Sequence, residues 1–370
     1  MNSTQRLPDK LTPLPAARDA WLSRLVPVAP GELRPADALR CIAADMPAMP
    51  GHPRHDVASV DGWALRAHDL IGASAYSPVP LPARPAWVEA GDRMPDACDC
   101  VLDADAVDAT GPIVQALAEA APGQGLRRAG SDIAAGDRLV DAGQRILACH
   151  LLLARAAGRP TITARRPRLR IVNLPGGAAT AAFAADQARD AGAEVSVIEP
   201  SARDAAAIAA ALDASSCDLI ATVGGTGVGR GDATIAAIGQ CGEIIAHGIA
   251  LQPGRTSAVG LIAGKPVVAL PGAPDQAFAA WWTLVVPALD RLSGRQPRPT
   301  FRLPLARKIA STVGITEIAL LQRRDDAWLP LATGELPLRM IARADAWLAI
   351  SAGSEGFAVG AAADAYMLRE

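Results

Sequence analysis

A run of glycines between residues 224 and 231 is the segment of this sequence best suited to chemistry. It follows a short apolar stretch, Leu219 to Val223, and precedes Asp232 and Thr234, where a helix can begin. Glycine permits positive φ angles and lets a ligand approach the backbone closely. Consecutive free N–H groups form a concave nest for phosphate, and the following helix adds the positive end of its dipole. The pattern predicts a buried strand that ends in an anion-binding loop, at the sheet edge where open α/β folds bind ligands.

This glycine loop matches no stricter nucleotide-binding motif. Its spacing differs from the dinucleotide fingerprint, and no Gly-Lys-Ser or Gly-Lys-Thr follows it as in a P-loop. A glycine-rich turn that binds no ligand is therefore the alternative interpretation of the same residues.

The cysteines and histidines do not form a metal-binding pattern. Of the six cysteines only Cys98 and Cys100 are close in sequence, and no second pair or nearby histidine completes a zinc motif. We expect these thiols to be buried or incidental. His52 and His55 flank a proline, and a solvated turn is favoured there over a pair of metal ligands.

Composition limits the class of protein. The chain has 370 residues, which implies two to four domains, and 50% of them are hydrophobic while only 4% are aromatic. The net charge of −2 gives no support for a nucleic-acid surface or a polybasic membrane anchor. No apolar run reaches the length of a membrane span, and residues 1–10 are polar and lack a signal-peptide core. We expect a soluble cytoplasmic protein with no nucleic-acid or membrane partner.

The elements that would position the glycine loop alternate in type between residues 165 and 293. The expected strands are 169–174, 194–198, 218–223, 243–251 and 266–270, and the expected helices are 178–191, 204–212 and 276–292. Strand–helix alternation of this kind predicts a mainly parallel sheet with helices on both faces, in a three-layer α/β domain.

The rest of the chain has other patterns. Residues 11–44 show helical periodicity, with a second short helix, opened by a proline, from Pro35 to Ala44. Residues 47–141 are rich in proline and glycine and contain short β-type runs, which predicts a small β-rich domain. Gln144 to Gly158 favours another helix, and the strand-like pieces of residues 301–370 favour a last β domain.

Several motifs occur along the chain in one fixed order. Val-Asp-Gly-Trp-Ala at 60–64 is followed by Arg-Arg-Ala-Gly-Ser-Asp at 127–132 and then by the glycine loop at 224–232. Gln-Pro-Gly-Arg at 252–255 and Leu-Pro-Gly-Ala-Pro at 270–274 complete the set. As an ordered set these motifs resemble the molybdopterin molybdenumtransferase family, which includes the E domain of gephyrin, and the resemblance covers nearly the whole chain.

The resemblance implies a four-domain α/β protein that forms an elongated homodimer. The implied divisions are a discontinuous helical domain at 1–46 and 142–166, an inserted β-rich domain at 47–141, an α/β molybdopterin-binding domain with a parallel-rich sheet at 167–298, and a C-terminal β domain at 299–370.

The family's reaction uses adenylylated molybdopterin and molybdate as substrates, together with Mg²⁺. The adenylate is hydrolysed and molybdenum enters the dithiolene. Mg²⁺ requires oxygen ligands and polarises the phosphates. Molybdate requires cationic donors, whereas the pterin phosphate suits backbone amides.

The family's acidic positions are only partly kept in this chain. Asp61 stands at the Asp of the family's S-x-M-D-G-Y-A motif, and Asp132 stands at the Asp of its G-E-D motif, where Ser131 replaces the preceding acid. In place of T-G-D-E-L the chain reads Leu-Pro-Gly-Gly-Ala at 174–178, so both acids of that motif are absent.

The basic and loop positions also differ from the family's pattern. The family's motif at the glycine loop is G-G-x-S-x-G-D-x-D. In this chain Gly227 replaces its Ser and Arg230 replaces its first Asp, whereas its last Asp is kept as Asp232. The two lysines of the K-P-G-K motif become Gln252 and Arg255. A Mg²⁺ site thus loses at least two acids and gains a nearby cation, which repels Mg²⁺ but attracts phosphate.

The resemblance assigns roles residue by residue. Asp61 and Asp132 are the predicted catalytic residues and the predicted Mg²⁺ ligands. The predicted pterin-binding and anion-binding residues are Gly224, Gly225, Thr226, Gly227, Gly229, Arg230, Asp232, Pro253, Gly254, Arg255, Pro271 and Gly272. Simpler roles stay open, because each of the two acids also suits the cap of a turn, Asp232 suits the N-cap of the next helix, and Arg255 suits a solvated loop.

Three functions are compatible with these residues. The first is a divergent molybdenumtransferase that inserts molybdate into molybdopterin. The second is a catalytically weakened paralogue that binds the pterin or the finished cofactor and delivers it to a molybdoenzyme, or that partners an active paralogue. The third is a scaffold that only mediates protein contacts. The match along the whole chain favours molybdenum cofactor biosynthesis as the process, and the lost acids leave the catalytic step open.

Overall fold

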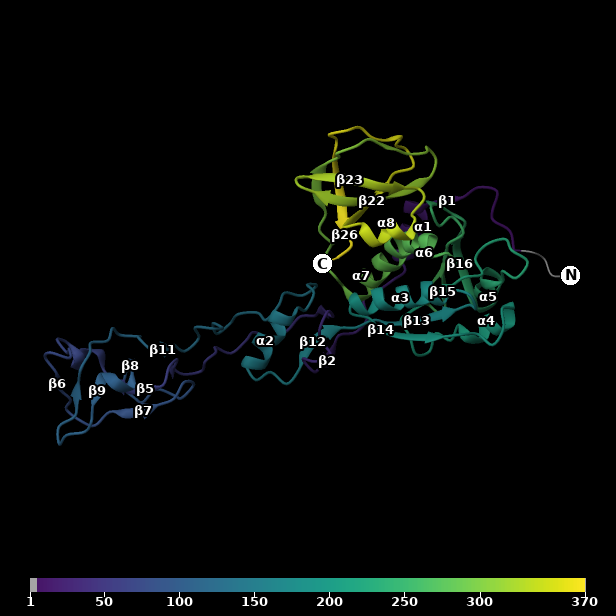
Figure 1. Ribbon diagram of the computed structural model, residues 1–370. Coiled ribbons are helices and arrows are strands. Elements are labelled where there is room, and N and C mark those ends of the chain that lie inside the picture. The colour runs from purple at the N-terminus through teal and green to yellow at the C-terminus, as the bar shows by residue number, and fades with distance from the viewer. Residues whose placement is uncertain (1–4, 370) are drawn as a thin grey trace.

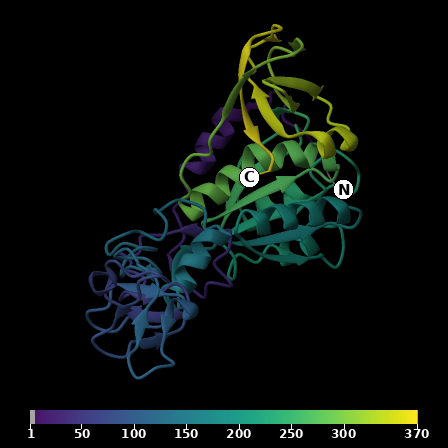
Figure 2. The same ribbon diagram turned by 60° about the vertical axis from the view of Figure 1, so that its left-hand side comes forward.

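The computed structural model describes residues 5–369 and has an elongated shape (Figure 1). An α/β part lies beside the C-terminal β part, and the segment 47–141 lies at the far end of the molecule, beyond a small region that contains helix α2 (Figures 1 and 2). The expected multidomain α/β architecture is confirmed.

The α/β part is built on a six-stranded sheet in the order β14-β13-β15-β19-β18-β16. The first four strands are parallel, and β18 and β16 add antiparallel partners at one edge. The bounds are β13 Arg168–Asn173, β14 Glu194–Ile198, β15 Leu219–Val223, β16 Gly242–His247, β18 Ala258–Ile262 and β19 Lys265–Leu270. Parallel strands end at one edge of a sheet, so the loops that follow them gather there.

Helices cover both faces of this sheet, as the alternation of elements predicted. Helices α3, α6 and α7 share one core with the sheet, and α4 and α5 share the other. Their bounds are α3 Ala178–Asp190, α4 Ala205–Ala211, α5 Thr234–Cys241, α6 Pro274–Ala280 and α7 Val286–Ser293, with a π-helical turn Trp281–Val285 between the last two. Leu219 and Val223 join the first core and Ile220 the second, which explains why the strand is apolar throughout.

One expected strand is in fact two strands. The run 243–251 is broken at Gly248, whose φ of +73° turns the chain between β16 and β17 Ile249–Gln252. Strand β17 leaves the α/β sheet and pairs in parallel with β22 of the C-terminal part, with Leu251 opposite Thr316. The Gln-Pro-Gly-Arg motif therefore lies where the two parts meet.

The N-terminal segment packs on the α/β part. Strand β1 Thr12–Pro13 pairs with β17, and helix α1 Leu14–Leu22 buries Trp21 completely against the sheet. The Trp21 Nε1–H group donates a hydrogen bond to the carbonyl oxygen of Gly260 at 2.9 Å. This anchor positions the residues before it next to the glycine loop.

The second helix expected from Pro35 to Ala44 is wrong. Arg40 has a φ of +70°, which no helix tolerates, and Ile42–Ala43 form strand β3. Strand β3 joins β2 Gly31–Leu33 and β12 Ile162–Arg165 in a small sheet beside helix α2 Ala148–Ala156. The predicted helix within 144–158 is thus present but starts later than expected.

The segment 47–141 forms several small sheets, as its composition predicted. Strand β5 Gly62–Leu65 lies between β7 and β8, directly after Asp61. The other elements are β4 Val57–Ala58, β6 Val79–Pro80, β7 Ala86–Val88, β8 Cys100–Leu102, β9 Val107–Asp108, β10 Gln115–Ala116 and β11 Leu126–Arg127, with 3-10 turns Ala67–Leu70 and Ala104–Ala106.

The C-terminal part is a β structure around the long strand β22 Thr316–Arg324, which pairs with β23 and β24. Its other elements are β20 Phe301–Pro304, β21 Ile309–Ala310, β23 Ala327–Thr333, α8 Leu338–Arg343, β24 Ala346–Ile350, β25 Gly356–Phe357 and β26 Ala362–Met367. Among residues 5–369, no helix is both long and apolar enough to span a bilayer.

Candidate functional site

Four loops meet at the carboxyl ends of the parallel strands and line a pocket of about 340 Å³, named here the glycine pocket. These four loops follow β13, β14, β15 and β19, and Thr256 adds a side chain from the loop between β17 and β18. The lining residues are Leu174, Pro175, Gly176, Gly177, Arg203, Gly224, Gly225, Thr226, Gly227, Asp232, Thr256, Pro271, Gly272, Ala273 and Gln276. The predicted placement of the glycine loop after a buried strand is therefore correct.

The backbone of the glycine loop presents free donors over three consecutive residues. Among residues 5–369, the N–H groups of Gly225, Thr226 and Gly227 donate to no protein acceptor, whereas that of Gly224 donates to the Leu270 carbonyl oxygen at 2.9 Å. Gly224 and Gly225 have φ angles of +93° and +67°. Successive free N–H groups of this kind form an anion nest.

Gly225 is required by the packing as well as by its φ angle. A Cβ atom at this position would lie 2.5 Å from Thr234 Oγ1 and 2.6 Å from Leu174 Cδ2. The Thr234 hydroxyl is itself engaged, because it donates to the Gly224 carbonyl oxygen at 2.8 Å. The nest therefore packs directly against Thr234, the first residue of helix α5.

Asp232 closes the glycine loop and does not cap the next helix. Its Oδ2 atom accepts a hydrogen bond from the Gly229 N–H group at 3.0 Å, while the N-cap of α5 is Ala233, without a side-chain hydrogen bond. The N-cap alternative is therefore wrong, because the carboxylate turns back toward the loop. Cβ atoms at Gly227 and Gly229 would lie 2.9 and 3.0 Å from this oxygen. The position of the Asp232 carboxylate therefore explains why both residues are glycine.

Gln5 ties the N-terminal segment to the glycine loop. Its Nε2 group donates to the Gly227 carbonyl oxygen at 2.7 Å, and its Oε1 atom accepts from the Ile235 N–H group at 3.1 Å. One amide thus satisfies a carbonyl of the loop and an amide of the first turn of α5. The sequence offered no signal for this contact, which spans more than 220 residues.

Arg203 is a residue of the pocket that the sequence interpretation missed. It follows β14, and its Nη1 group donates to the Pro175 carbonyl oxygen at 2.7 Å. It is the only cation among the lining residues, whereas the predicted Arg230 is exposed and lies outside the lining. The sequence offers no local signal for Arg203, because its place in the pocket depends on β14 lying next to β13.

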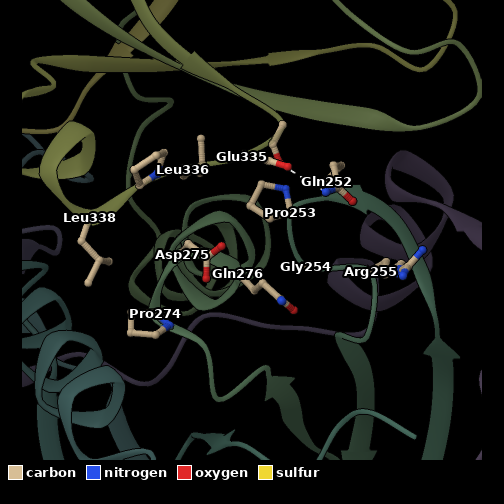
Figure 3. A pocket seen from close by; sticks show the side chains of 12 residues that line it. Gln252, Pro253, Gly254, Arg255, Pro274, Asp275, Gln276, Glu335, Leu336 and Leu338 are labelled. Atoms are coloured by element: carbon tan, nitrogen blue, oxygen red, sulfur yellow. Dashed lines mark hydrogen bonds between the residues drawn. The ribbon is translucent and has the colours of Figure 1, made fainter.

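A second pocket, of about 600 Å³, lies around the Gln-Pro-Gly-Arg motif and is named here the Arg255 pocket (Figure 3). Pro253, Gly254 and Arg255, three of the predicted binding residues, line it. Two carboxylates that were not predicted, Asp275 and Glu335, share it with Arg255. The further lining residues are Gln252, Pro274, Gln276, Gly334, Leu336, Pro337 and Leu338.

The two pockets adjoin each other. Gln276, in the first turn of α6, lines both of them. The loop 271–273 that precedes α6 lines the glycine pocket and contains the predicted binding residues Pro271 and Gly272. A ligand that fills the glycine pocket therefore has a second binding space next to it.

Asp61 directly precedes β5 and Asp132 follows β11, and both strands lie in the segment at the far end of the molecule from β13 and β15 (Figure 1). Both carboxylates are engaged locally. Asp61 Oδ1 accepts a hydrogen bond from the Ala90 N–H group at 2.7 Å, and Asp132 Oδ2 is paired with Arg127 Nη1 at 3.2 Å. A single chain does not bring these two acids to the nest.

The residues of one chain do not fit a protein-held Mg²⁺ ion. Within residues 5–369 there is no group of three or more His, Cys, Asp and Glu side chains arranged to hold a metal. Asp232 is the only acid in the lining of the glycine pocket, and it shares that lining with Arg203. Hard divalent cations need several oxygen ligands, which the lining of this pocket does not supply.

The cysteines are free thiols, and most are buried or half-buried, as expected. Burial raises the pKa of the Cys100 thiol to about 12 and also raises the pKa of Cys41 and Cys217. Thiols with raised pKa values are poor nucleophiles and poor metal ligands at neutral pH.

Comparison with known proteins identifies the family. Two family models match: the MoeA N-terminal region (domain I and II) over residues 12–158, and the probable molybdopterin binding domain over residues 177–291. Molybdopterin molybdenumtransferase 2 of Mycobacterium tuberculosis is 30% identical over 286 residues, which are 65% of this chain and 70% of that protein. The chain belongs to the molybdopterin molybdenumtransferase family.

More distant relatives extend this likeness. A putative molybdopterin biosynthesis protein of Methanocaldococcus jannaschii is 24% identical over 74% of this chain and 76% of its own. The crystal structure of the molybdopterin biosynthesis MoeA protein of Pyrococcus horikoshii has a TM-score of 0.71 and 26% identity, covering 98% of this chain and 100% of that one. The family resemblance read from the motifs is confirmed, and with it molybdenum cofactor biosynthesis as the family's process. Both pockets draw on the segment matched by the molybdopterin-binding model.

Proposed function

We propose that this member of the molybdenumtransferase family binds molybdopterin in the glycine pocket and takes part in the insertion of molybdate into it. The observation that carries the proposal is the meeting of four loops around the three free N–H groups of Gly225, Thr226 and Gly227. Such a nest suits the phosphate of a pterin. The adjoining Arg255 pocket offers space for the second substrate.

The chain's own groups would bind and orient the pterin phosphate. The nest supplies backbone donors, and the hydroxyls of Thr226 and Thr256, 3.0 Å apart, lie beside it. Pro271 and Gly272 border the same space and lead to Gln276, which lines both pockets. In this arrangement a phosphate held at the nest fixes the rest of the pterin in relation to the Arg255 pocket.

Molybdate would enter the Arg255 pocket as an oxyanion. Arg255 supplies the positive charge, and Gln252 and Gln276 supply amide donors, although the Gln252 amide already donates to the Gly334 carbonyl oxygen at 3.2 Å. Asp275 and Glu335 oppose an anion there. We infer that free molybdate binds weakly and that bound pterin improves its binding.

We further propose a homodimer in which segment 47–141 of one copy serves the glycine pocket of the other. The position of β5 and β11, next to Asp61 and Asp132, at the other end of the molecule from β15 supports this arrangement (Figure 1). Their proposed role, with or without Mg²⁺, then depends on a second copy. The test mixes an Asp61→Ala variant with an Arg203→Glu variant, which reverses the charge of the glycine pocket at an exposed side chain. Activity regained on mixing supports the shared site, and no recovery argues against it.

The deciding experiment titrates the purified protein with adenylylated molybdopterin, with and without Mg²⁺ and molybdate, and follows both binding and AMP release. Mg²⁺-dependent AMP release that Asp61→Ala abolishes would support a transferase. Tight binding without release would support a protein that carries or delivers the pterin or cofactor to a molybdoenzyme. Absence of binding would overturn the proposal and leave only a scaffold role.

A further inference from the structure

The charge of the glycine pocket is set by two side chains, Arg203 and Asp232. Asp232 accepts a hydrogen bond from the Gly229 N–H group and keeps its negative charge. Arg203 is exposed, and its guanidinium makes one hydrogen bond among residues 5–369, to the Pro175 carbonyl oxygen. Because a guanidinium carries five N–H donors, several remain for a ligand.

Arg203 is held toward the pocket from both sides. On the chain side, Asp204 is the N-cap of α4 and accepts a hydrogen bond from the Ala207 N–H group at 2.9 Å, which fixes the backbone next to Arg203. On the far side, the contact with Pro175 fixes the guanidinium over the loop that follows β13. A cation held in this way loses little side-chain freedom when it binds an anion.

The guanidinium also lies over the place where the two acids of the T-G-D-E-L motif are absent. Gly176 and Gly177 stand in their positions. A Cβ atom on Gly176 would have Arg203 Nη1 as its nearest neighbour, at 4.0 Å. The chain thus has a cation beside position 176, where the acid of the family's motif would favour a metal ion.

We propose that Arg203 is the anion-binding cation of the glycine pocket and replaces a divalent metal as the positive charge on the phosphate of the ligand. This inference rests on the proposed function, because it assumes a phosphate at the nest. Arginine binds phosphate oxygens with two parallel hydrogen bonds and cannot be deprotonated at physiological pH. Phosphate binding at this pocket therefore needs no Mg²⁺.

The experiment measures the Kd of molybdopterin by calorimetry with EDTA and with Mg²⁺, at two salt concentrations. For the unaltered protein we expect the same Kd in both buffers. Arg203→Ala should weaken binding by about tenfold, as expected for one charge-assisted hydrogen-bonding group, and should reduce the salt dependence. The Kd of Arg203→Lys should lie between those of the unaltered protein and Arg203→Ala, since lysine keeps the charge but lacks the planar guanidinium. The matched control is Arg307→Ala, an exposed arginine of the C-terminal part outside the lining, which should leave the Kd unchanged.

The outcomes separate this inference from the proposed function. If the unaltered protein binds molybdopterin in EDTA and Arg203→Ala binds it equally tightly, the proposed function stands and the role of Arg203 is refuted. If the unaltered protein loses binding in EDTA, a metal supplies the charge and the inference is again refuted. If the unaltered protein binds no molybdopterin in either buffer, both proposals fail.

Discussion

The Oδ2 atom of Asp232 lies 3.0 Å from the backbone nitrogen of Gly229 and accepts its hydrogen bond. This contact folds the glycine loop back on itself within four residues. It also places a negative charge beside the free N–H groups of the nest, where it opposes an anion. Asp232 therefore shapes the loop at a cost in anion affinity, and the two effects can be separated.

Asp232→Asn keeps an oxygen that can accept from Gly229 but removes the charge. We expect this variant to bind phosphate-bearing ligands several times more tightly, because a like charge next to the anion is gone. Asp232→Ala removes the hydrogen bond too, so amide exchange at Gly229 should become faster. Calorimetry with molybdopterin and hydrogen exchange measure both effects. Weaker binding by Asp232→Asn would mean instead that the carboxylate holds a cation.

Gly225→Val should destabilise the protein strongly. Its φ of +67° strains any β-branched residue, and a Cβ would lie 2.5 Å from Thr234 Oγ1. Strain and overpacking give an expected loss of about 2–4 kcal/mol in the free energy of unfolding. Gly231→Val is the matched control, because a Cβ there meets nothing within 4 Å. Urea unfolding of both variants tests this, and equal stability of the two would contradict the packing argument.

Gln5→Ala should loosen the glycine loop without unfolding the protein. It removes hydrogen bonds with Gly227 and Ile235, and we expect a local loss of about 1–2 kcal/mol. The Ile235 amide should exchange faster, and ligand affinity should fall because the nest is less well ordered. Arg6→Ala, an exposed neighbour, serves as the control. Unchanged exchange at Ile235 would show that the N-terminal segment does not hold the loop.

His247 should make the loop sensitive to acid. Burial lowers the pKa of this side chain, and its Nε2 atom lies 3.4 Å from the Thr226 carbonyl oxygen. A histidine with a lowered pKa takes up its proton more readily in the unfolded chain. Its contribution to stability is therefore complete above the unfolded pKa of about 6.5 and is lost as the pH falls below that value.

Melting temperatures between pH 7.5 and 5 test this effect. His247→Gln should flatten the fall in melting temperature on the acid side. His68→Gln, at an exposed position, should leave it unchanged. If the melting temperature falls with pH in the same way for all three proteins, the acid sensitivity comes from groups other than His247.

The loop itself could be predicted from the sequence because its signals are local. Strand β15 is a continuous apolar run, and five glycines follow it within eight residues. Arg203 could not be predicted in the same way. Its place in the pocket depends on β14 lying next to β13, and the alternation of strands and helices does not specify strand order.

Arg230 and the two remote acids show the same limit. Arg230 is in the glycine loop, yet the turn closed by Asp232 leaves it outside the pocket lining. Asp61 and Asp132 are placed by a segment of about a hundred residues whose position relative to the nest is a tertiary property. Sequence motifs identified the family correctly, but they did not indicate which charges meet.

The Arg255 pocket leads to the last prediction, on molybdate. Arg255 shares this pocket with Asp275 and Glu335, so its lining carries one cation and two anions. Glu335→Gln should tighten molybdate binding by about two- to fivefold at low salt, since it removes one repulsive charge at a partly solvated site. The gain should vanish at high salt because mobile ions screen the same charge. Glu355→Gln, an exposed acid outside the lining, is the control. Weaker binding by Glu335→Gln would mean that this carboxylate helps to position a donor for the oxyanion. Arg255 alone would then not explain how molybdate binds.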